Sequence, residues 1–369
     1  MQLASSTTNL GLAMSDSSHH DDDGKTLILS IKEDVINFKQ KSEEVLQSIA
    51  FRAMIFFQII AYGSYSILVH LCEENNVITF SSTTMNFIVE FVKLSFSLFG
   101  VIYSSATSTI DFSLSLKQCI GWFRQSLPYA IPGILYFINN NLAVHMQVYM
   151  DPASYQILAN FKIFTTAILY RLLIKHKLTR QQWFALSLLF FGGVAYSLGT
   201  IKNSSVMSKR SSASSTHMRE MYIHPYGIPM IGIYCTLSGL AGVYNEYILK
   251  KHYNESLHVQ NMFLYCYGTI LNFIPAIGAA ILSSHTTRSF NPFRGFSFYT
   301  WLIVLTQALN GLFMSVVIKH SSNIVRLFVI SFSLVVTAAL SFFIFHINFN
   351  IYFCFSFVTM TCALSLYYS

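Results

Sequence analysis

Long apolar segments, separated by short polar ones, recur along most of the chain. The hydrocarbon core of a bilayer is about 30 Å thick, so a helix that crosses it needs about 20 apolar residues. Only helices and closed barrels satisfy every backbone hydrogen bond in lipid. The pattern therefore predicts an all-α polytopic membrane protein with ten transmembrane helices. The expected spans lie near 51–71, 84–104, 127–147, 152–173, 181–200, 226–249, 259–282, 298–319, 323–345 and 348–367.

The composition agrees with lipid as the surrounding solvent. Of the 369 residues, 53% are hydrophobic and 11% are charged, and the mean hydropathy is +0.49. A soluble domain of this size would not bury so much apolar surface. The six cysteines are single and show no CxxC spacing, so neither a disulfide framework nor a metal site is predicted. The net charge of +7 is explained by Lys and Arg beside the spans rather than by nucleic acid binding.

The chain matches itself weakly when it is shifted by 170 residues. Asn140 then falls on Asn310 and Trp183 on Phe353, and the boundaries of the first five spans fall on those of the last five. A repeat of five spans is odd-numbered, so its second copy crosses the membrane in the opposite sense. The expected architecture is two inverted five-helix repeats, which is typical of carriers and argues against a seven-helix receptor.

Four regions follow from this division. The polar start of the chain contains no apolar core behind a basic segment, so we expect no cleavable signal peptide and take the first span as a signal anchor. More Lys and Arg flank the spans on the side of the N-terminus, which favours cytoplasmic termini. Asn203, in the sequon Asn203-Ser204-Ser205, would then face the lumen as a candidate glycosylation site. The regions are a disordered cytoplasmic tail over 1–48, the first repeat over 49–200, a polar lumenal loop over 201–225 and the second repeat over 226–369.

Ionisable side chains inside the predicted spans are costly in lipid, so each one is a functional candidate. Glu90 and Lys93 lie three residues apart in the second span, on one helix face, and are predicted to form a structural ion pair. Lys162 lies near the middle of the fourth span, with no acid within a turn of it. Two interpretations stay open for Lys162: a cation that faces the substrate, or a partner of Glu246 in a salt bridge.

Two further cations lie close together in the second half of the chain. Lys319 ends the eighth expected span and Arg326 follows one turn inside the ninth. For Lys319 alone, an ordinary positive flank of a span is the simpler explanation. Together with Lys162, however, the pair would clamp a diphosphate, because Lys and Arg both make charge-assisted hydrogen bonds to phosphate oxygens. The sequence therefore predicts an anionic substrate.

Amide and tyrosine side chains accompany these charges. Three consecutive amides in the third span, Asn139–Asn141, are costly without partners, and bonds between helices account for two of them, so we expect at least one to face a cavity. Amide edges can read a pyrimidine, and tyrosine rings can stack on it. Each tyrosine taken alone is better explained by packing. The remaining candidates are Asn261, Tyr136, Tyr155, Tyr265 and Tyr267.

Four segments in fixed order carry a family resemblance: DPASYQILANFKIFTTAILY, GLAGVYNEYILK, VQNMFLYCYG and LNGLFMSVVIKHSSNIVRLFVISFSLVV. They resemble the signature segments of nucleotide-sugar transporters, solute carrier family 35, subfamily A, and the resemblance extends from about residue 50 to residue 367. It implies ten spans in the drug/metabolite transporter fold and residence in Golgi or ER membranes. It also implies exchange of a cytosolic nucleotide sugar for a lumenal nucleoside monophosphate.

Individual positions carry expectations from the same resemblance. Lys162 and Lys319 are implied to lie beside the phosphates, and Arg326 replaces a family lysine. Three departures concern specificity: Tyr267 replaces a small hydroxyl residue of the sialic-acid branch, Ala308 replaces a serine of that branch, and His320-Ser321-Ser322 replaces the usual Tyr-Ala-Asp. The residues implied to line the nucleotide pocket are Asn140, Asn261, Tyr136, Tyr155 and Tyr265.

The predicted function is transport of a pyrimidine nucleotide sugar, UDP-linked, across the Golgi membrane in exchange for the nucleoside monophosphate. We expect no enzyme activity, because the sequence shows no acidic metal motif, nucleophile elbow or phosphate-binding glycine loop. No cofactor is expected, and the predicted partners are the two nucleotides, the bilayer, and a second copy or other nucleotide-sugar transporters. Two alternatives stay open: a carrier for a CDP-linked alditol such as CDP-ribitol, and a non-transporting membrane scaffold. The ER is the second choice of location.

Overall fold

The protein is described by a computed structural model. It covers residues 44, 48–74, 77–78, 80–107, 116–150, 152–175, 177–211, 224–287, 293, 295–345 and 351–369. Apart from residues 44 and 48, the expected tail over 1–48 lies outside the described residues. The chain divides after Met54, and the helix packing described below belongs to the unit Ile55–Ser369.

Helices make up nearly all of the described chain. Each expected span coincides with one helix, except the fourth, which is split into α6 and α7. A short hairpin joins the first two helices, because Glu73–Glu74 (β1) pairs antiparallel with Val77–Ile78 (β2). The helices are α3 (Ile49–His70), α4 (Ser82–Thr107), α5 (Leu116–Tyr149), α6 (Pro152–Ala159), α7 (Lys162–Leu173), α8 (Arg180–Ser211), α9 (Gly227–Lys251), α10 (Leu257–Thr287), α11 (Phe298–His320), α12 (Asn323–Phe345) and α13 (Ile351–Tyr368).

Seven of the described helices are long and apolar enough to cross a membrane: α3, α4, α8, α9, α11, α12 and α13. The protein is therefore a polytopic all-α membrane protein, as expected. The other three expected spans contain α5, the pair α6 and α7, and α10. These helices are interrupted or carry buried amides such as Asn139, Asn261 and Asn272, which lower their hydropathy. Polar residues of this kind are tolerated where a helix faces protein or an aqueous cavity rather than lipid.

Two helices extend beyond their expected limits. α5 begins at Leu116, before the expected start near 127, and α8 continues to Ser211, inside the expected loop over 201–225. Hydropathy marks only the part of a helix that lies in lipid, whereas backbone hydrogen bonds continue into the polar surroundings. Asn203 lies on the helical backbone of α8, and its side chain lies outside the described residues.

The fourth expected span is interrupted at Asn160 and Phe161. Here the amides of Asn160, Phe161 and Ile163 donate to carbonyls three residues earlier, at 3.2, 3.0 and 3.0 Å. Such hydrogen bonds define a tight 3₁₀ turn, which frequently marks a functional hinge within a helix. The turn ends α6 and begins α7 at Lys162, so a helix N-terminus lies in the middle of the expected span.

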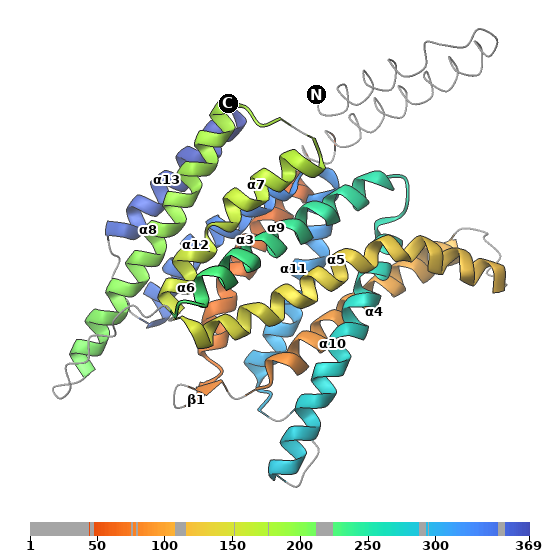
Figure 1. Cartoon of the computed structure of the whole chain (residues 1–369), viewed down its shortest axis with the longest axis horizontal. Coiled ribbons are helices and arrows are strands. Elements are labelled where there is room, and N and C mark those ends of the chain that lie inside the picture. Colours follow the sequence, from red (N-terminus) through yellow and green to blue (C-terminus); the bar gives the residue numbers. More distant parts are fainter. Residues whose placement is uncertain are drawn as a thin grey trace. The chain divides into compact units, whose positions relative to one another are not determined.

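The helices pair in a way that matches two related halves of the chain (Figure 1). α4 packs along α10, and α8 packs along α13. α4 and α10 correspond to the second expected span of each half, and α8 and α13 correspond to the fifth. Each pair therefore joins a helix of the first half to its counterpart in the second. α5 also contacts α10, just as α11 contacts α4. This exchange of partners is the one expected from a pseudo-two-fold axis between inverted repeats.

Two glycines repeat this exchange at the level of single residues. A Cβ on Gly63 of α3 would lie 2.7 Å from the Ser333 carbonyl oxygen of α12. A Cβ on Gly239 of α9 would lie 3.1 Å from the Thr166 amide of α7. The first helix of each half, α3 or α9, therefore closely approaches the helix at the fourth position of the other half, α12 or α7. A methyl group would force a shift at Gly63 and would be tightly packed at Gly239.

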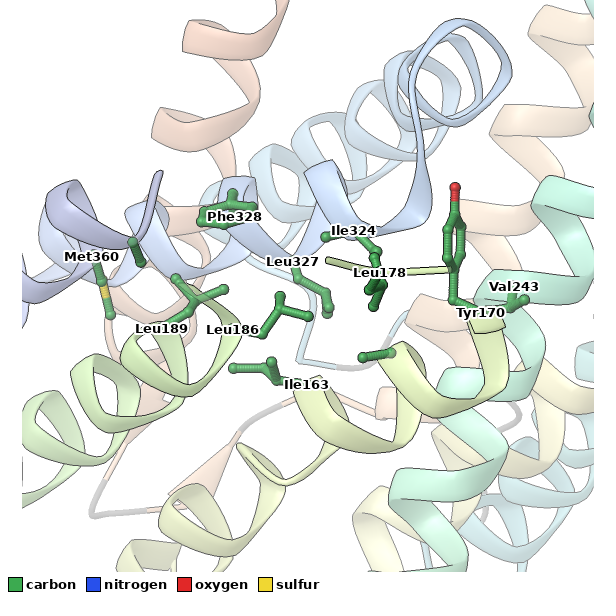
Figure 2. Packing of buried hydrophobic residues seen from close by; sticks show 12 residues of the cluster. Ile163, Tyr170, Leu178, Leu186, Leu189, Val243, Ile324, Leu327, Phe328 and Met360 are labelled. Carbon is green, nitrogen blue, oxygen red and sulfur yellow. The ribbon is translucent and has the colours of Figure 1, made fainter. Parts of the chain in front are cut away.

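One buried apolar cluster connects the two halves beside the interrupted helix. Figure 2 shows Ile163 of α7 near Leu186 of α8, with α12 above them, and Tyr170 at the other end of the cluster beside Val243 of α9. Burial of this kind keeps α7 packed against its neighbours despite the interruption at Asn160. The members of the cluster include Ile163, Tyr170, Leu178, Leu186, Leu189, Val243, Ile324, Leu327, Phe328 and Met360.

Candidate functional site

The first residue of α7, Lys162, borders an internal cavity of about 170 Å³. Its ammonium group has no ion pair or hydrogen-bond partner among the residues that the structure describes. The side chains around the cavity are Tyr155, Gln156, Asn160, Ile163, Ser197, Tyr234, Leu327, Ile330, Ser331 and Leu334.

The alternative partner of Lys162, Glu246, is occupied elsewhere. Its Oε1 accepts from Lys250 Nζ at 2.6 Å, and its Oε2 accepts from the Asn323 amide at 2.7 Å. Tyr170 also donates its hydroxyl hydrogen to Oε1, at 3.3 Å. The salt bridge between Lys162 and Glu246 is therefore a wrong prediction. Lys250 lies one turn from Glu246 on the same helix, so it pairs without the ordering of a second helix.

Arg326 lies among tyrosine side chains. Its Nη1 donates to the Tyr136 hydroxyl at 3.3 Å, and Tyr62 also interacts with the guanidinium. Its Nε has no partner, and no carboxylate pairs with it in the described part of the chain. Tyr234 is an electrostatic neighbour of Arg326 and also borders the Lys162 cavity. Tyr234 is therefore the residue that links the cavity beside Lys162 to Arg326 and its partner Tyr136.

The pair Glu90 and Lys93 is present, with Nζ and Oε1 2.5 Å apart. Lys93 also lies over the Tyr265 ring, 4.5 Å from its centroid. Tyr265 is buried, and its hydroxyl donates to the Gly311 carbonyl at 3.0 Å and lies 3.1 Å from Ser315 Oγ. The ion pair is thus packed against a tyrosine that the family resemblance assigns to the nucleotide pocket.

Lys319 lies apart from the Lys162 cavity, in the polar cluster between α9 and α10. Its Nζ donates to the Glu255 carbonyl at 2.7 Å and to Gln260 Oε1 at 3.0 Å. Both acceptors are neutral, so its charge is not balanced by them. Nearby, the Tyr253 hydroxyl lies 3.2 Å from His320 Nδ1, and burial raises the pKa of the Tyr253 phenol, which keeps it protonated. The expected three-cation clamp is not assembled in this conformation.

The amides of α5 point in different directions. Asn141 donates to the Phe137 carbonyl of its own helix at 2.8 Å, whereas Asn139 is buried and its Oδ1 has no described partner. Asn140 is exposed. At about 100° per residue, Asn140 lies nearly opposite the exposed stripe of Ile131, Ile134 and Ile138, which marks the lipid side. Its amide therefore lies on the helix face away from this stripe, one turn after Tyr136.

The other expected residues occupy three different environments. Asn261 is buried, and its Oδ1 has no partner among the described residues. Tyr155 packs against Tyr234, with ring centroids 5.8 Å apart, and borders the cavity. Tyr267 lies instead at the contact of α5 and α10, where its hydroxyl is 2.9 Å from Ser126 Oγ. Its position indicates packing in this conformation.

Two tyrosines of this region, Tyr62 and Tyr234, were not predicted from the sequence. Each lies in the first helix of one half, α3 or α9, within an otherwise apolar stretch. Because neither is next to a charged residue, the search for charges inside the spans passes over them. The shift of 170 residues does not point to them either, because it places Tyr62 on Gly232 and Tyr234 on Ser64. Within the described residues, no cluster of three His, Cys, Asp or Glu side chains lies close enough to hold a metal ion.

Comparison with known proteins shows where this arrangement occurs. The family model "Nucleotide-sugar transporter" matches residues 44–368. The probable UDP-sugar transporter protein SLC35A4 of Xenopus tropicalis is 38% identical over 89% of this chain and 94% of its own length. Proteins of that name from Danio rerio and Homo sapiens are 38% and 34% identical, over 86% and 85% of this chain and 93% of their own lengths. This agrees with the four ordered segments identified in the sequence.

A solved structure supports the fold independently of sequence identity. This structure, known only as "Crystal structure of protein", superposes with a TM-score of 0.56 at 11% identity, over 86% of this chain and 96% of its own. At that identity the likeness concerns the fold alone, whereas the family model and the relatives cover most of the chain. The chain belongs to the nucleotide-sugar transporter family and is a transporter rather than an enzyme.

Proposed function

We propose that this transporter exchanges a UDP-linked sugar for the nucleoside monophosphate across the Golgi membrane. The names of the relatives support the UDP-linked class. The observation that carries the proposal is Lys162, which lines a cavity of about 170 Å³ and has no ion pair or side-chain hydrogen bond among the described residues. A cation held in a low-dielectric interior is unfavourable until an anion binds it.

The positive charges near the cavity match a diphosphate. Lys162 and Arg326 share the neighbour Tyr234, and neither has a carboxylate partner in the described chain. Lys319 lies apart from this cavity, where its Nζ donates to the Glu255 carbonyl and to Gln260 Oε1, so its approach to a phosphate would need a change of conformation. The exposed amide of Asn140 and the rings of Tyr136 and Tyr155 would then contact the nucleoside.

The size of the cavity indicates that substrate binding needs helix movement. Sites for ligands of this class enclose about 300–1,000 Å³, whereas the space beside Lys162 measures about 170 Å³. The cavity therefore accommodates part of a nucleotide, and the remainder requires the two repeats to separate. Rocking of inverted repeats around a site near the midplane provides such a movement.

Exchange follows from the same unpaired charge. An empty carrier must occlude Lys162 without an anion, which makes its return slow, whereas either nucleotide neutralises the charge and speeds the return. Both substrates contain a phosphate bonded to the same nucleoside, so both meet this requirement. Cytoplasmic termini, assembly with a second copy and assembly with other nucleotide-sugar transporters belong to the same proposal, with the ER as the second choice of membrane.

The decisive experiment uses the purified chain in liposomes that contain UMP. We expect uptake of labelled UDP-linked sugars, and faster uptake than for CMP- or CDP-linked donors. The Lys162→Ala variant should lose exchange by about 100-fold or more, the scale of an ion pair to phosphate, while its thermal stability without nucleotide stays unchanged. Lys177→Ala serves as the matched control, because Lys177 is an exposed lysine outside the cavity.

The same assay separates the alternatives. Full exchange by Lys162→Ala would refute the role of this residue, and preference for CDP-ribitol would favour the alditol carrier. A chain without residues 1–45 should exchange normally if transport is the function. If neither the full chain nor this truncated form exchanges any nucleotide, the scaffold interpretation gains support.

A further inference from the structure

Two buried amide side chains near the midpoints of their helices have no role in the site described above. Gln58 lies in α3 and Asn310 in α11, and they are 0% and 1% exposed. Gln58 Nε2 donates weakly to the Asn310 carbonyl at 3.4 Å. The Gln58 Oε1 and both polar atoms of the Asn310 side chain have no hydrogen-bond partner among the described residues.

Such atoms are unusual in a folded interior, since nearly all buried polar groups make hydrogen bonds. A buried amide without a partner loses its hydrogen bonds to water and makes none within the protein, which is unfavourable in free energy. The two side chains together present two acceptor oxygens and an NH₂ donor in one place. They therefore form a neutral polar site that a ligand with both donors and acceptors would satisfy.

The position of this amide pair connects it to the cations. Tyr62, which interacts with Arg326, follows Gln58 by one helical turn. Gly311, directly after Asn310, accepts the Tyr265 hydroxyl hydrogen, and a Cβ on Gly311 would lie 2.6 Å from Lys93 Cδ. The amides thus border the same polar interior as Arg326 but contribute no charge of their own.

The repeat symmetry supplies a further argument. Asn310 falls on Asn140 when the chain is shifted by 170 residues, and the two lie in the third helix of each half, α11 and α5. Asn140 is exposed, whereas Asn310 is buried. A nucleotide sugar has two uncharged ends joined by phosphates, so it offers one hydrogen-bonding group to each of the two amide positions.

We propose that Gln58 and Asn310 form the subsite for the hydroxyl groups of the transported sugar. This inference rests on the proposed function and assigns the sugar to the second amide position, with the nucleoside near Asn140. A sugar hydroxyl both donates and accepts, which matches the unpaired atoms of the two amides. Because both side chains are fully buried here, the sugar reaches them only when α3 and α11 separate during the transport cycle.

The test compares a substrate that carries the sugar with one that lacks it. Asn310→Leu and Gln58→Met remove the polar atoms at similar size, and Asn272→Leu is the control, because the buried Asn272 amide already donates to Gly268 of its own helix at 2.8 Å. Purified full-length variants are reconstituted in liposomes. Half-saturation is measured for UDP-galactose and UDP-N-acetylglucosamine against internal UMP, and for UMP against UMP.

We expect the two test variants to raise the half-saturation concentration of at least one UDP-sugar about tenfold, the effect of about one lost hydrogen bond. The half-saturation concentration for UMP self-exchange should stay within about twofold of wild type. The Asn272→Leu control should change neither the value for the UDP-sugars nor the value for UMP. The melting temperature of Asn310→Leu without nucleotide should stay the same or rise, because no described side-chain hydrogen bond of Asn310 is lost. Gln58→Met loses one weak hydrogen bond to the Asn310 backbone carbonyl, so its melting temperature should change little.

Three outcomes would overturn the inference. If UMP and the UDP-sugars weaken equally, the amides hold the helices rather than the sugar. If neither weakens, the amides contact no substrate. If wild-type protein exchanges UMP and no UDP-sugar, or nothing at all, the proposed function itself fails, and this result is distinct from a selective effect of the variants.

Discussion

At the scale of single residues, buried charges are explained by their nearest partners. Glu246 is completely buried and accepts hydrogen bonds from Lys250, Tyr170 and the amide of Asn323. Lys250 also donates to the Ser321 carbonyl at 2.5 Å. These contacts fix the short turn between α11 and α12. Lys319 lies in the last turn of α11, and Arg326 lies in the first turn of α12. Glu246 and Lys250 thus position the region of two candidate substrate cations.

The two partners of this pair should respond unequally to substitution. Lys250→Met leaves the Glu246 carboxylate buried without its cation, at a cost of about 3 kcal/mol. Glu246→Gln keeps an acceptor oxygen, and the Lys250 ammonium is partly exposed and retains Ser321, so its cost should be smaller. Melting temperatures of the purified variants in detergent check this order. An equal loss, or a larger loss for Glu246→Gln, would contradict the assignment of the pair.

At the scale of helices, close approach matters as much as apolar character. α3 lies against α12 at Gly63, and α9 lies against α7 at Gly239. Small residues allow such approach in membranes, where packing and hydrogen bonds rather than hydrophobic exclusion join the helices. The contact between α3 and α12 also includes a hydrogen bond from Thr337 Oγ1 to the Gly63 carbonyl at 2.8 Å. These helices connect the two halves of the chain.

Gly63→Ala should therefore destabilise the protein. The new methyl group would meet the Ser333 carbonyl at 2.7 Å and Val336 at 2.8 Å, and overpacking of this kind costs about 1–3 kcal/mol. The same substitution at Gly232 of α9 is the control, since a Cβ there would meet no described atom within 4 Å. At Gly232, alanine should be neutral or stabilising by about 0.5–1 kcal/mol because glycine is a weaker helix former. Thermal unfolding that ranks the two variants equally would argue against the close contact.

At the scale of the whole molecule, the number of spans decides the sidedness of the chain. Seven described helices pass a test of length and hydropathy, and the remaining expected spans contain α5, α6 with α7, and α10. α5 and α10 pack against other helices on the side of their polar residues, which explains why hydropathy underestimates them. An even number of spans places the two termini on the same side of the membrane, whereas an odd number places them on opposite sides.

Ten spans predict that both termini lie on one side of the membrane, and the bias of Lys and Arg beside the spans predicts that this side is the cytosol. Epitope tags at either end should be digested by protease in sealed, right-side-out Golgi vesicles without detergent. A lumenal loop between α8 and α9 should resist digestion until the membrane is opened. Protection of only one of the two end tags would show an odd number of spans and would contradict the inverted five-helix repeats.

Much of the architecture could be predicted because the bilayer imposes a simple length requirement. Apolar runs of about 20 residues are visible in one dimension, and they located every described long helix, including α9 and α12, within a few residues at most ends. The start of α5 and the end of α8 were missed because helical hydrogen bonds extend past the apolar run. The interruption at Asn160 was missed because its neighbours remain apolar.

The candidate site divides in the same way. The sequence by itself determined which charges must lie within the membrane, including Lys162 and Arg326, because an ionisable residue inside an apolar run needs no fold to be recognised. Only the tertiary structure decided their partners: Glu246 joins Lys250 and not Lys162, Lys319 joins Gln260, and Gln58 meets Asn310. The physical reason is that hydrogen bonds act over about 3 Å, and the helices that bring such atoms together are far apart in the sequence.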